Sequence, residues 1–200
     1  YVNQFYNPLA GANLISADSF VNFNGVIDHD DGTYAGWSNN SGLPVGFSFD
    51  YNGNTYSTVN VNVNGWASVG KQPLPINPNN NNNLYNTSNP GNALAPYWGD
   101  HYYRTLEPGY HPTRISYLTT AIADTNPNAA PGSLLHIFTV EWKDLNINDK
   151  TNPQSIASFQ LRIIENSMAN DPAVPDHRAT IEFQYGPNGW GSTVSTVGAA

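Results

Sequence analysis

Cysteine is absent from this 200-residue chain, and charged side chains are scarce. Without a thiol, the chain can form neither a disulfide framework nor a thiolate metal site. Seven Lys and Arg stand against 15 Asp and Glu, which gives a formal net charge of -8. Nucleic acids and anionic membrane surfaces require clustered basic residues, so we expect no nucleic-acid partner.

Long apolar runs are also missing. No stretch approaches the roughly 18 apolar residues of a membrane-spanning helix, so no membrane insertion is expected. The chain begins at Tyr1 rather than Met, which suits an exported protein whose signal has been removed. Abundant Asn, Gly and Pro with little Lys is typical of exported surface proteins of bacteria or archaea. We therefore expect an extracellular or cell-surface location.

The segment from Leu43 to Gly70 carries the clearest strand pattern. Hydrophobic residues recur at every second position over 45–51 and again over 59–63, which is the period of half-buried strands. Between these two runs, Asn52-Gly53 predicts a type I′ hairpin because both residues accept a positive φ. A second tight turn is expected at Asn64-Gly65. The segment therefore predicts three consecutive strands.

The second half of the chain predicts further strands, at 114–120, 134–142, 156–165, 179–185 and 192–197, and no segment keeps a helical period. A short strand is expected near 93–100 and a less regular one at 13–24, while the Asn- and Pro-rich segment 71–92 is expected to be a surface loop. The pattern indicates an all-β fold, an antiparallel two-sheet β-sandwich, jelly-roll-like, with about nine or ten strands and long Asn/Pro/Gly-rich loops. We expect one domain over residues 1–200, with 1–42 as an N-terminal extension or arm.

Several short motifs occur in a characteristic order: LPVGFSF at 43–49, VNVNGW at 61–66, APYWGD at 95–100, FTVEW at 138–142, FQL at 159–161 and IEFQYG at 181–186. Together they resemble the nidogen-like extracellular domain of large secreted bacterial surface proteins, over residues 43–186. The resemblance implies an extracellular β-sandwich module of surface, matrix or adhesive proteins, with no catalytic residues to carry over. Residues 1–42 and the asparagine-rich loop lie outside the pattern.

Acidic residues gather in one turn-rich loop, at Asp28, Asp30 and Asp31. Carboxylate oxygens on a flexible loop are the ligands that Ca²⁺ prefers, and Asp100 would add a fourth if its loop lay nearby. The spacing departs from that of an EF-hand, because Asn39 stands where a bidentate Glu is required. Calcium is thus the one candidate cofactor, and the alternative is a solvated acidic turn.

Catalytic motifs are lacking: the chain has neither a Gly-x-Ser-x-Gly elbow nor a His-Glu-x-x-His zinc motif. Glu141 and Glu182 lie on predicted strands, and a glycosidase needs two carboxyls about 5 to 10 Å apart. Carboxylates facing outward from a sheet are more often solvated or paired, here with Arg162. His136 is interpreted as a core residue, and a dispersed Ser-His-Asp triad stays open. We predict a protein that is not an enzyme, with a secreted hydrolase as the remote alternative.

Aromatic residues in or beside loops are candidates for glycan binding, because flat rings stack on sugars. These residues are Trp37, Tyr102, Tyr103, Tyr110 and Trp190. Trp66, Trp98 and Trp142 are instead expected in the core. Asn39 and Asn86 begin sequences that match the N-glycosylation acceptor pattern.

The N-terminal segment raises the question of assembly. A strand such as 13–24 can be added to the open sheet edge of a neighbouring subunit, which gives a head-to-tail polymer that does not close. The alternative is that this segment completes its own sandwich. We therefore expect a non-enzymatic extracellular structural or adhesive protein whose partners are copies of itself or other surface proteins, in its sharper form a filament subunit. A glycan-binding, lectin-like module assisted by calcium is the alternative.

Overall fold

The computed structural model describes residues 6–22, 24–34, 42–70, 92–147, 155–166 and 177–186, together with the backbone of 196–199. Within these ranges the regular structure is strand, apart from one 3-10 turn, η1 (Ala17–Ser19). The predicted all-β class is therefore confirmed. No helix in this part of the chain has the length and apolar character needed to cross a membrane. The asparagine-rich loop lies outside the described residues, except for Asn92.

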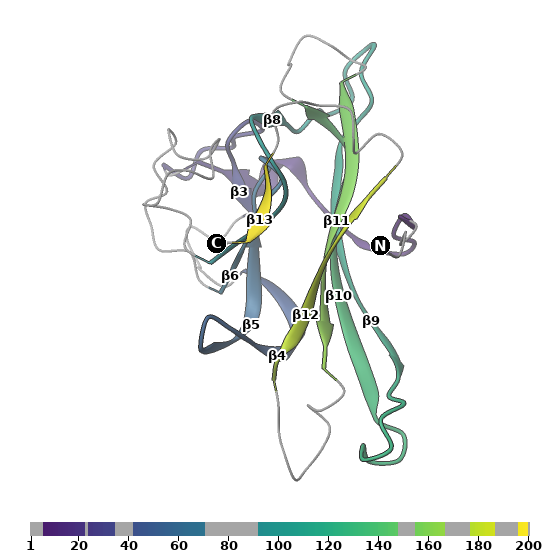
Figure 1. Ribbon diagram of the computed structural model, residues 1–200. Helices are drawn as coiled ribbons and strands as arrows, with labels where there is room; N and C mark the ends of the chain where they lie inside the picture. The colour runs from purple at the N-terminus through teal and green to yellow at the C-terminus, as the bar shows by residue number, and fades with distance from the viewer. Residues whose placement is uncertain are drawn as a thin grey trace.

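Two antiparallel sheets make up most of the fold (Figure 1). The long sheet has the order β1-β9-β10-β11-β12, with β8 also paired to β10; its strands are β1 (Asn13–Ile15), β8 (His101–Tyr102), β9 (Arg114–Ala123), β10 (Leu134–Ile147), β11 (Ile156–Glu165) and β12 (Ala179–Tyr185). The short sheet has the order β13-β7-β6-β5-β4; its strands are β4 (Leu43–Tyr51), β5 (Asn54–Val61), β6 (Ala67–Val69), β7 (Ala93–Trp98) and β13 (Thr196–Ala199). A separate pair is formed by β2 (Phe20–Val21) and β3 (Thr33–Tyr34).

The connections differ from the jelly-roll prediction, which is wrong. Strands β4 to β7 follow one another within the short sheet, and β9 to β12 do so within the long sheet. Each sheet is therefore built around a meander of four sequential strands, to which β1, β8 and β13 are added from other parts of the sequence, whereas a jelly roll is built from Greek keys. Tight turns such as Asn52-Gly53, where φ is 47° and 77°, keep sequential strands adjacent. The described residues contain thirteen strands rather than about nine or ten, because several have only two to four residues.

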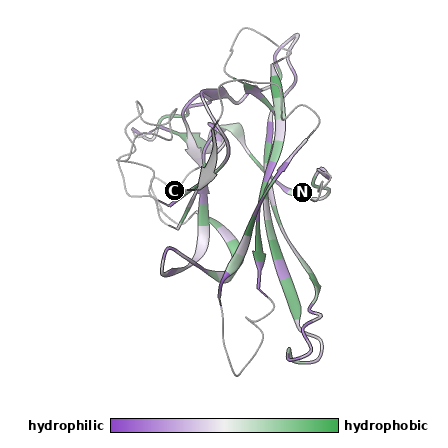
Figure 2. Ribbon diagram, in the orientation of Figure 1, coloured by the Kyte–Doolittle hydropathy of each residue, from purple (hydrophilic) through white to green (hydrophobic). Residues whose placement is uncertain are grey.

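The inner faces of the two sheets meet in one hydrophobic core. Along β10 and β11, inward residues are register partners, such as Val140 with Leu161 and Trp142 with Phe159. The rings of this last pair stack with their centroids 5.2 Å apart. Figure 2 shows hydrophobic and hydrophilic residues interspersed along the long strands, as this alternation requires. The predicted burial of Trp66, Trp98 and Trp142 is confirmed.

The central segment forms the three predicted strands, but its asparagines do not face water. Asn60, Asn62 and Asn64 are fully buried, so the expected half-buried pattern is wrong at the end of β5. The main-chain carbonyl of Asn62 accepts a hydrogen bond from Nε1 of Trp142 at 2.9 Å. This bond joins the short sheet to the long sheet inside the core.

The N-terminal segment is not the single strand expected over 13–24. It divides into β1, the turn η1 and β2. β1 pairs with β9 of the same chain, with Ile15 opposite Ile115. Ile15 and Phe20 both enter the core. The segment from Asn13 to Val21 is therefore part of the fold, and the described residues before Asn13 form no strand.

Two glycines with nearly the same φ angle test how tightly the turn between β5 and β6 packs against β7. Gly65 lies in that turn, and Gly53 lies in the turn between β4 and β5. Gly65 has φ 75°, and a Cβ there would collide with the carbonyl of Tyr97; Gly53 has φ 77° and open space around it. We expect Gly53→Ala to lower the free energy of unfolding by about 1 kcal/mol through backbone strain alone. Gly65→Ala should cost about 2 to 4 kcal/mol, because main chain has to move. Equal losses in urea unfolding would contradict this packing.

Candidate functional site

A row of polar side chains crosses the outer face of the long sheet. Its members are register partners on β9, β10, β11 and β12: Ser116, Glu141, Gln160 and Gln184. All four are at most 7% exposed. We call them the polar row. A sheet face that points away from the core is usually solvated, so its burial requires a cover.

The cover is part of the N-terminal extension of the same chain, residues 6–15. From here on, the arm means these residues alone. One carboxylate oxygen of Glu141 accepts hydrogen bonds from the Tyr6 hydroxyl at 2.8 Å and from the Leu9 N–H at 3.2 Å. The Gln160 amide donates to that oxygen at 2.9 Å and to the Asn7 carbonyl at 2.8 Å. In Figure 1 the purple N-terminal segment lies on the side of the long sheet away from the short sheet.

The chemistry of the arm contact is that of a buried, charge-assisted hydrogen-bond group. Burial, and then the Glu141 carboxylate, raises the pKa of the Tyr6 hydroxyl far above its ordinary value. Tyr6 therefore remains a donor at every physiological pH. Hydrogen bonds to an ionised group are roughly twice as strong as neutral ones, and an unpaired buried carboxylate is costly. The arm thus supplies the hydrogen-bond donors that the buried Glu141 carboxylate requires, and the polar row in turn holds the arm in place.

The two carboxylates considered as a glycosidase pair have different surroundings. Glu182 accepts a hydrogen bond from Arg162 at 2.8 Å, the cross-strand ion pair that the sequence suggested. Glu141 is not a solvated outward carboxylate, because the arm covers it. His136 bonds to Glu165 at 2.7 Å and stacks on Phe47, so its ring has a partner. Its side chain is 37% exposed, however, so its interpretation as a core residue is wrong.

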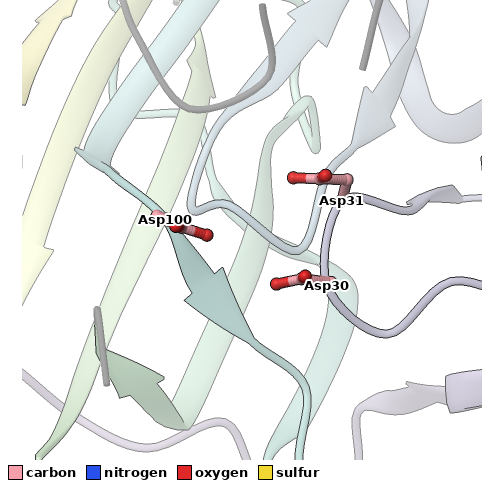
Figure 3. A group of neighbouring side chains, drawn as sticks. All are labelled: Asp30, Asp31 and Asp100. Atoms are coloured by element: carbon pink, nitrogen blue, oxygen red, sulfur yellow. The ribbon is translucent and has the colours of Figure 1, made fainter. Parts of the chain in front are cut away.

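A second group of polar residues lies where the β2–β3 hairpin approaches the end of β7. Carboxylate oxygens of Asp30, Asp31 and Asp100 all lie within 4.8 Å of one another. Figure 3 shows Asp30 and Asp31 on one loop and Asp100 on another segment, with the three side chains converging. We call these three the acidic cluster. Two oxygens bound to one Ca²⁺ at about 2.4 Å lie no more than about 4.8 Å apart, so the donor set fits that ion.

The structure thus brings together three of the four predicted calcium ligands. Asp28 instead shapes the loop: its Oδ1 accepts hydrogen bonds from the N–H groups of Asp30 at 3.0 Å and Asp31 at 3.1 Å. Asp28 is not among the three carboxylates that converge. An Asp two or three residues before the donated N–H is a common turn former, because its short side chain reaches the backbone directly.

The acidic cluster is held in position by two asparagines, Asn62 and Asn64. The sequence pattern had assigned both to the polar face of a strand. Asn64 donates from Nδ2 to Oδ1 of Asp31 at 3.0 Å and accepts from the His101 N–H at 2.8 Å. Its side chain thus ties the Asp31 loop to the residue after Asp100. Asn62 donates to the Asp31 carbonyl at 3.1 Å. The repeated Asn in the VNVNVN run was the available signal, but alternation alone does not reveal whether a polar face is buried.

The electrostatics of the acidic cluster favour a bound cation. Burial raises the pKa of Asp31 from 3.8 to about 6; the Asn64 hydrogen bond opposes this, and neighbouring carboxylates raise the pKa further. Burial also lowers the pKa of His101 to about 4, so this ring is neutral at pH 7. It supplies no positive charge to balance Asp100. A divalent cation would relieve the repulsion among the three carboxylates.

The aromatic residues considered for glycan binding are distributed differently from the expectation. Tyr103 is buried, with its hydroxyl donating to the Ile15 carbonyl at 3.3 Å, so it cannot offer a ring face to a sugar and that assignment is wrong. Arg104 lies over the rings of Tyr102 and Tyr110, at 4.5 and 4.2 Å from their centroids. Each ring therefore already has a cation on one face. Trp37, Trp190, Asn39 and Asn86 lie outside the described residues.

Comparison with known families gives a clear result. A family model described as NIDO related matches residues 15–195. The chain belongs to this nidogen-related family. The match begins inside the arm and so covers more than the 43–186 segment that carries the resemblance. Nidogen-like domains are extracellular, which supports the expected location. No curated protein and no solved structure matches the chain.

The raised pKa of Asp31 predicts how stability depends on pH in the absence of metal. Because the pKa is higher in the folded chain than in the unfolded chain, protonation of Asp31 favours folding; this contribution is complete below pH 3.8 and disappears as the pH rises through about 6. With chelator present, we expect a loss on the order of 1 kcal/mol between about pH 4 and pH 7, reduced by solvent screening.

Asp31→Asn should remove this part of the pH profile in denaturant titrations, while Asp124→Asn should leave it in place. Asp124 is a suitable control because it lies in the β9–β10 loop and caps the Asn126 N–H at 2.9 Å. The same slope in the Asp31 variant and the wild-type chain would contradict the assignment.

Proposed function

We propose that this nidogen-related chain is an exported, non-enzymatic structural or adhesive module that joins to other copies through its arm. The observation that carries this proposal is the covered polar row. The Glu141 carboxylate and the Gln160 amide are bound by Tyr6, Asn7 and Leu9, which are more than 130 positions away in the sequence. Contacts so distant along the chain can be made equally well by the arm of a neighbouring copy.

The nature of the arm contact supports exchange. The arm residues before Asn13 are held by hydrogen bonds to a polar surface rather than by burial of large apolar side chains. A polar face can be exposed to water for a short time at modest cost, whereas an exposed apolar groove would aggregate. Over longer times, however, the buried Glu141 carboxylate needs hydrogen-bond donors. The polar row therefore needs to be covered by an arm, but the arm of another copy can replace the chain's own.

The edge of the long sheet supports the same proposal. β1 covers β9 only over Ile115, Ser116 and Tyr117. No other described strand pairs with this outer edge of β9. Exposed edges are templates for pairing with another chain. An arm from a neighbour would add its strand at this edge, and a repeat of that contact gives an open head-to-tail filament.

The test is truncation combined with a free arm peptide. Removing residues 1–12 leaves β1 and the buried Phe20 in place, so the chain should fold. It removes the contacts of Tyr6, Asn7 and Leu9 with the polar row, and the three paired positions of β1 that remain are too few to hold a neighbouring copy. We expect the full chain to form polymers by electron microscopy and light scattering, and the truncated chain to remain monomeric. The truncated chain should bind a synthetic peptide of residues 1–12, measured by fluorescence anisotropy. A Tyr6→Phe peptide should bind about tenfold more weakly, because it lacks the donor to Glu141.

Polymers of the truncated chain equal to those of the full chain would refute the proposal. So would a full chain that stays monomeric at all concentrations. Equal binding of the two peptides would show that the Glu141 contact does not hold the arm.

A second proposal is that the acidic cluster binds Ca²⁺ as a structural ion. The converging oxygens of Asp30, Asp31 and Asp100 support it. The ion would join the β2–β3 hairpin loop to the segment after β7, alongside the Asn64 bridge. No chemical step is assigned to it.

Calcium should raise the thermal midpoint of the full chain at neutral pH, and chelator should reverse the change. At a concentration about 100-fold above Kd, the gain is about 2.7 kcal/mol, which corresponds to several degrees. Asp31→Asn and Asp100→Asn should abolish the shift, and Asp124→Asn should keep it. Mg²⁺ should act more weakly because it requires a stricter geometry. A calcium-independent midpoint in the wild-type chain would refute this second proposal.

A further inference from the structure

A cavity of about 380 Å³ lies beside the polar row, between the arm and the β9–β10 pair. One wall comes from the arm and the other from the sheet; the lining residues are Leu9, Gly11, Ala12, Leu14, Arg114, Ser116, Glu141 and Lys143. The cavity therefore exists only where an arm covers the sheet. It is distinct from the acidic cluster.

Two cations stand at the sheet wall of this cavity. Arg114 and Lys143 are register partners across β9 and β10, two residues along the strands from the Ser116–Glu141 pair. Like charges directly opposite one another on a sheet are destabilising. The chain has only seven basic residues, so placing two of them here concentrates much of its scarce positive charge.

Neither cation forms an ion pair within the described part of the chain. Arg104 bonds to Glu107 and Arg162 bonds to Glu182, each at 2.8 Å. Arg114 and Lys143 make no ion pair and no side-chain hydrogen bond with any described residue. Arg114 is exposed and Lys143 is half-buried. An anion between them would convert a repulsive pair into an attractive site.

The rest of the lining narrows the chemistry of that anion. Ser116 and Glu141 are buried and line the same cavity. The Glu141 carboxylate repels further negative charge but accepts hydrogen bonds from hydroxyl groups. The arm adds small and apolar surface from Gly11, Ala12 and Leu14, the last of which is 62% exposed. Such surface packs against C–H faces.

We propose that this cavity binds an acidic saccharide, with its carboxylate or sulfate group between Arg114 and Lys143 and its hydroxyl groups directed to Ser116 and Glu141. A densely charged polyanion fits poorly, because it would bring charge against Glu141 and against a chain with a net charge of -8. The inference deepens the adhesive role proposed above and rests on it: the arm that joins copies also forms a wall of the saccharide site.

The experiment is a calorimetric titration of the full chain, at low salt, with three matched oligosaccharides. One carries a single carboxylate (sialyllactose), one carries a single sulfate (a monosulfated lactose), and one is neutral (lactose). We expect binding of at least one acidic ligand and none of the neutral ligand. Arg114→Gln and Lys143→Gln should each weaken binding about tenfold, because each loses a charge-assisted contact. Their thermal midpoints should not fall, because each change relieves the repulsive pair.

Arg162→Gln is the matched control, because it removes the same charge from the same sheet face but lies away from this cavity. It should keep the affinity within about twofold, as expected for a charge outside the site. Three outcomes would overturn the proposal: no acidic saccharide binds, Arg162→Gln weakens binding as much as Arg114→Gln, or polyglutamate and polyphosphate bind as well as the saccharides. The last would indicate a general anion site.

Failure of this inference is distinguishable from failure of the assembly proposal. If polymers form but no acidic saccharide binds, the cavity assignment alone is overturned. If saccharide binds to a chain that never polymerises, the arm closes its own cavity, and the assembly proposal alone is overturned.

Discussion

Buried polar side chains need hydrogen-bond partners, and this chain buries such side chains on both of its sheets. At the end of β5, Asn62 and Asn64 are out of contact with water. Their side-chain amides form hydrogen bonds with the Asp31 loop and with the backbone N–H of His101. That requirement brings the acidic cluster together. The hydrogen bond from Trp142 to the Asn62 carbonyl then fixes this corner against the long sheet. An unpaired group at any of these points would cost about 1 to 3 kcal/mol.

The same constraint explains the outer face of the long sheet. Glu141 and Gln160 cannot remain buried without donors and acceptors, and Tyr6, Asn7 and Leu9 supply them. The arm is thus bound by the chemistry of the row rather than by a hydrophobic groove. By covering the polar row, the arm also forms one wall of the cavity that Arg114 and Lys143 line. Assembly and saccharide binding are therefore proposed for one structural unit, the arm together with β9 and β10.

The sequence predicted the all-β class, the hairpin turns and the buried tryptophans, and it pointed to three acidic residues that the fold brings together, because these depend on alternation, turn chemistry and local clustering. It did not predict the burial of Asn64 or Glu141. Both belong to polar faces that ordinarily meet water, and only a distant segment covers them. Tyr103 was misassigned for a related reason: a residue beside a loop can still point into the core. The jelly-roll expectation failed because strand order depends on contacts between distant residues, which periodicity does not record.

The central claim is that the arm covers the polar row and can do so between copies. The most direct measurement uses a cysteine pair at Leu14 and Ser116, which are register partners of β1 and β9, in a chain that has no native cysteine. Assembled protein carrying Leu14→Cys and Ser116→Cys is oxidised and separated under denaturing, non-reducing conditions. The account predicts a ladder of disulfide-linked copies that collapses to monomer on reduction. Disulfides confined to single chains in assembled material would contradict it.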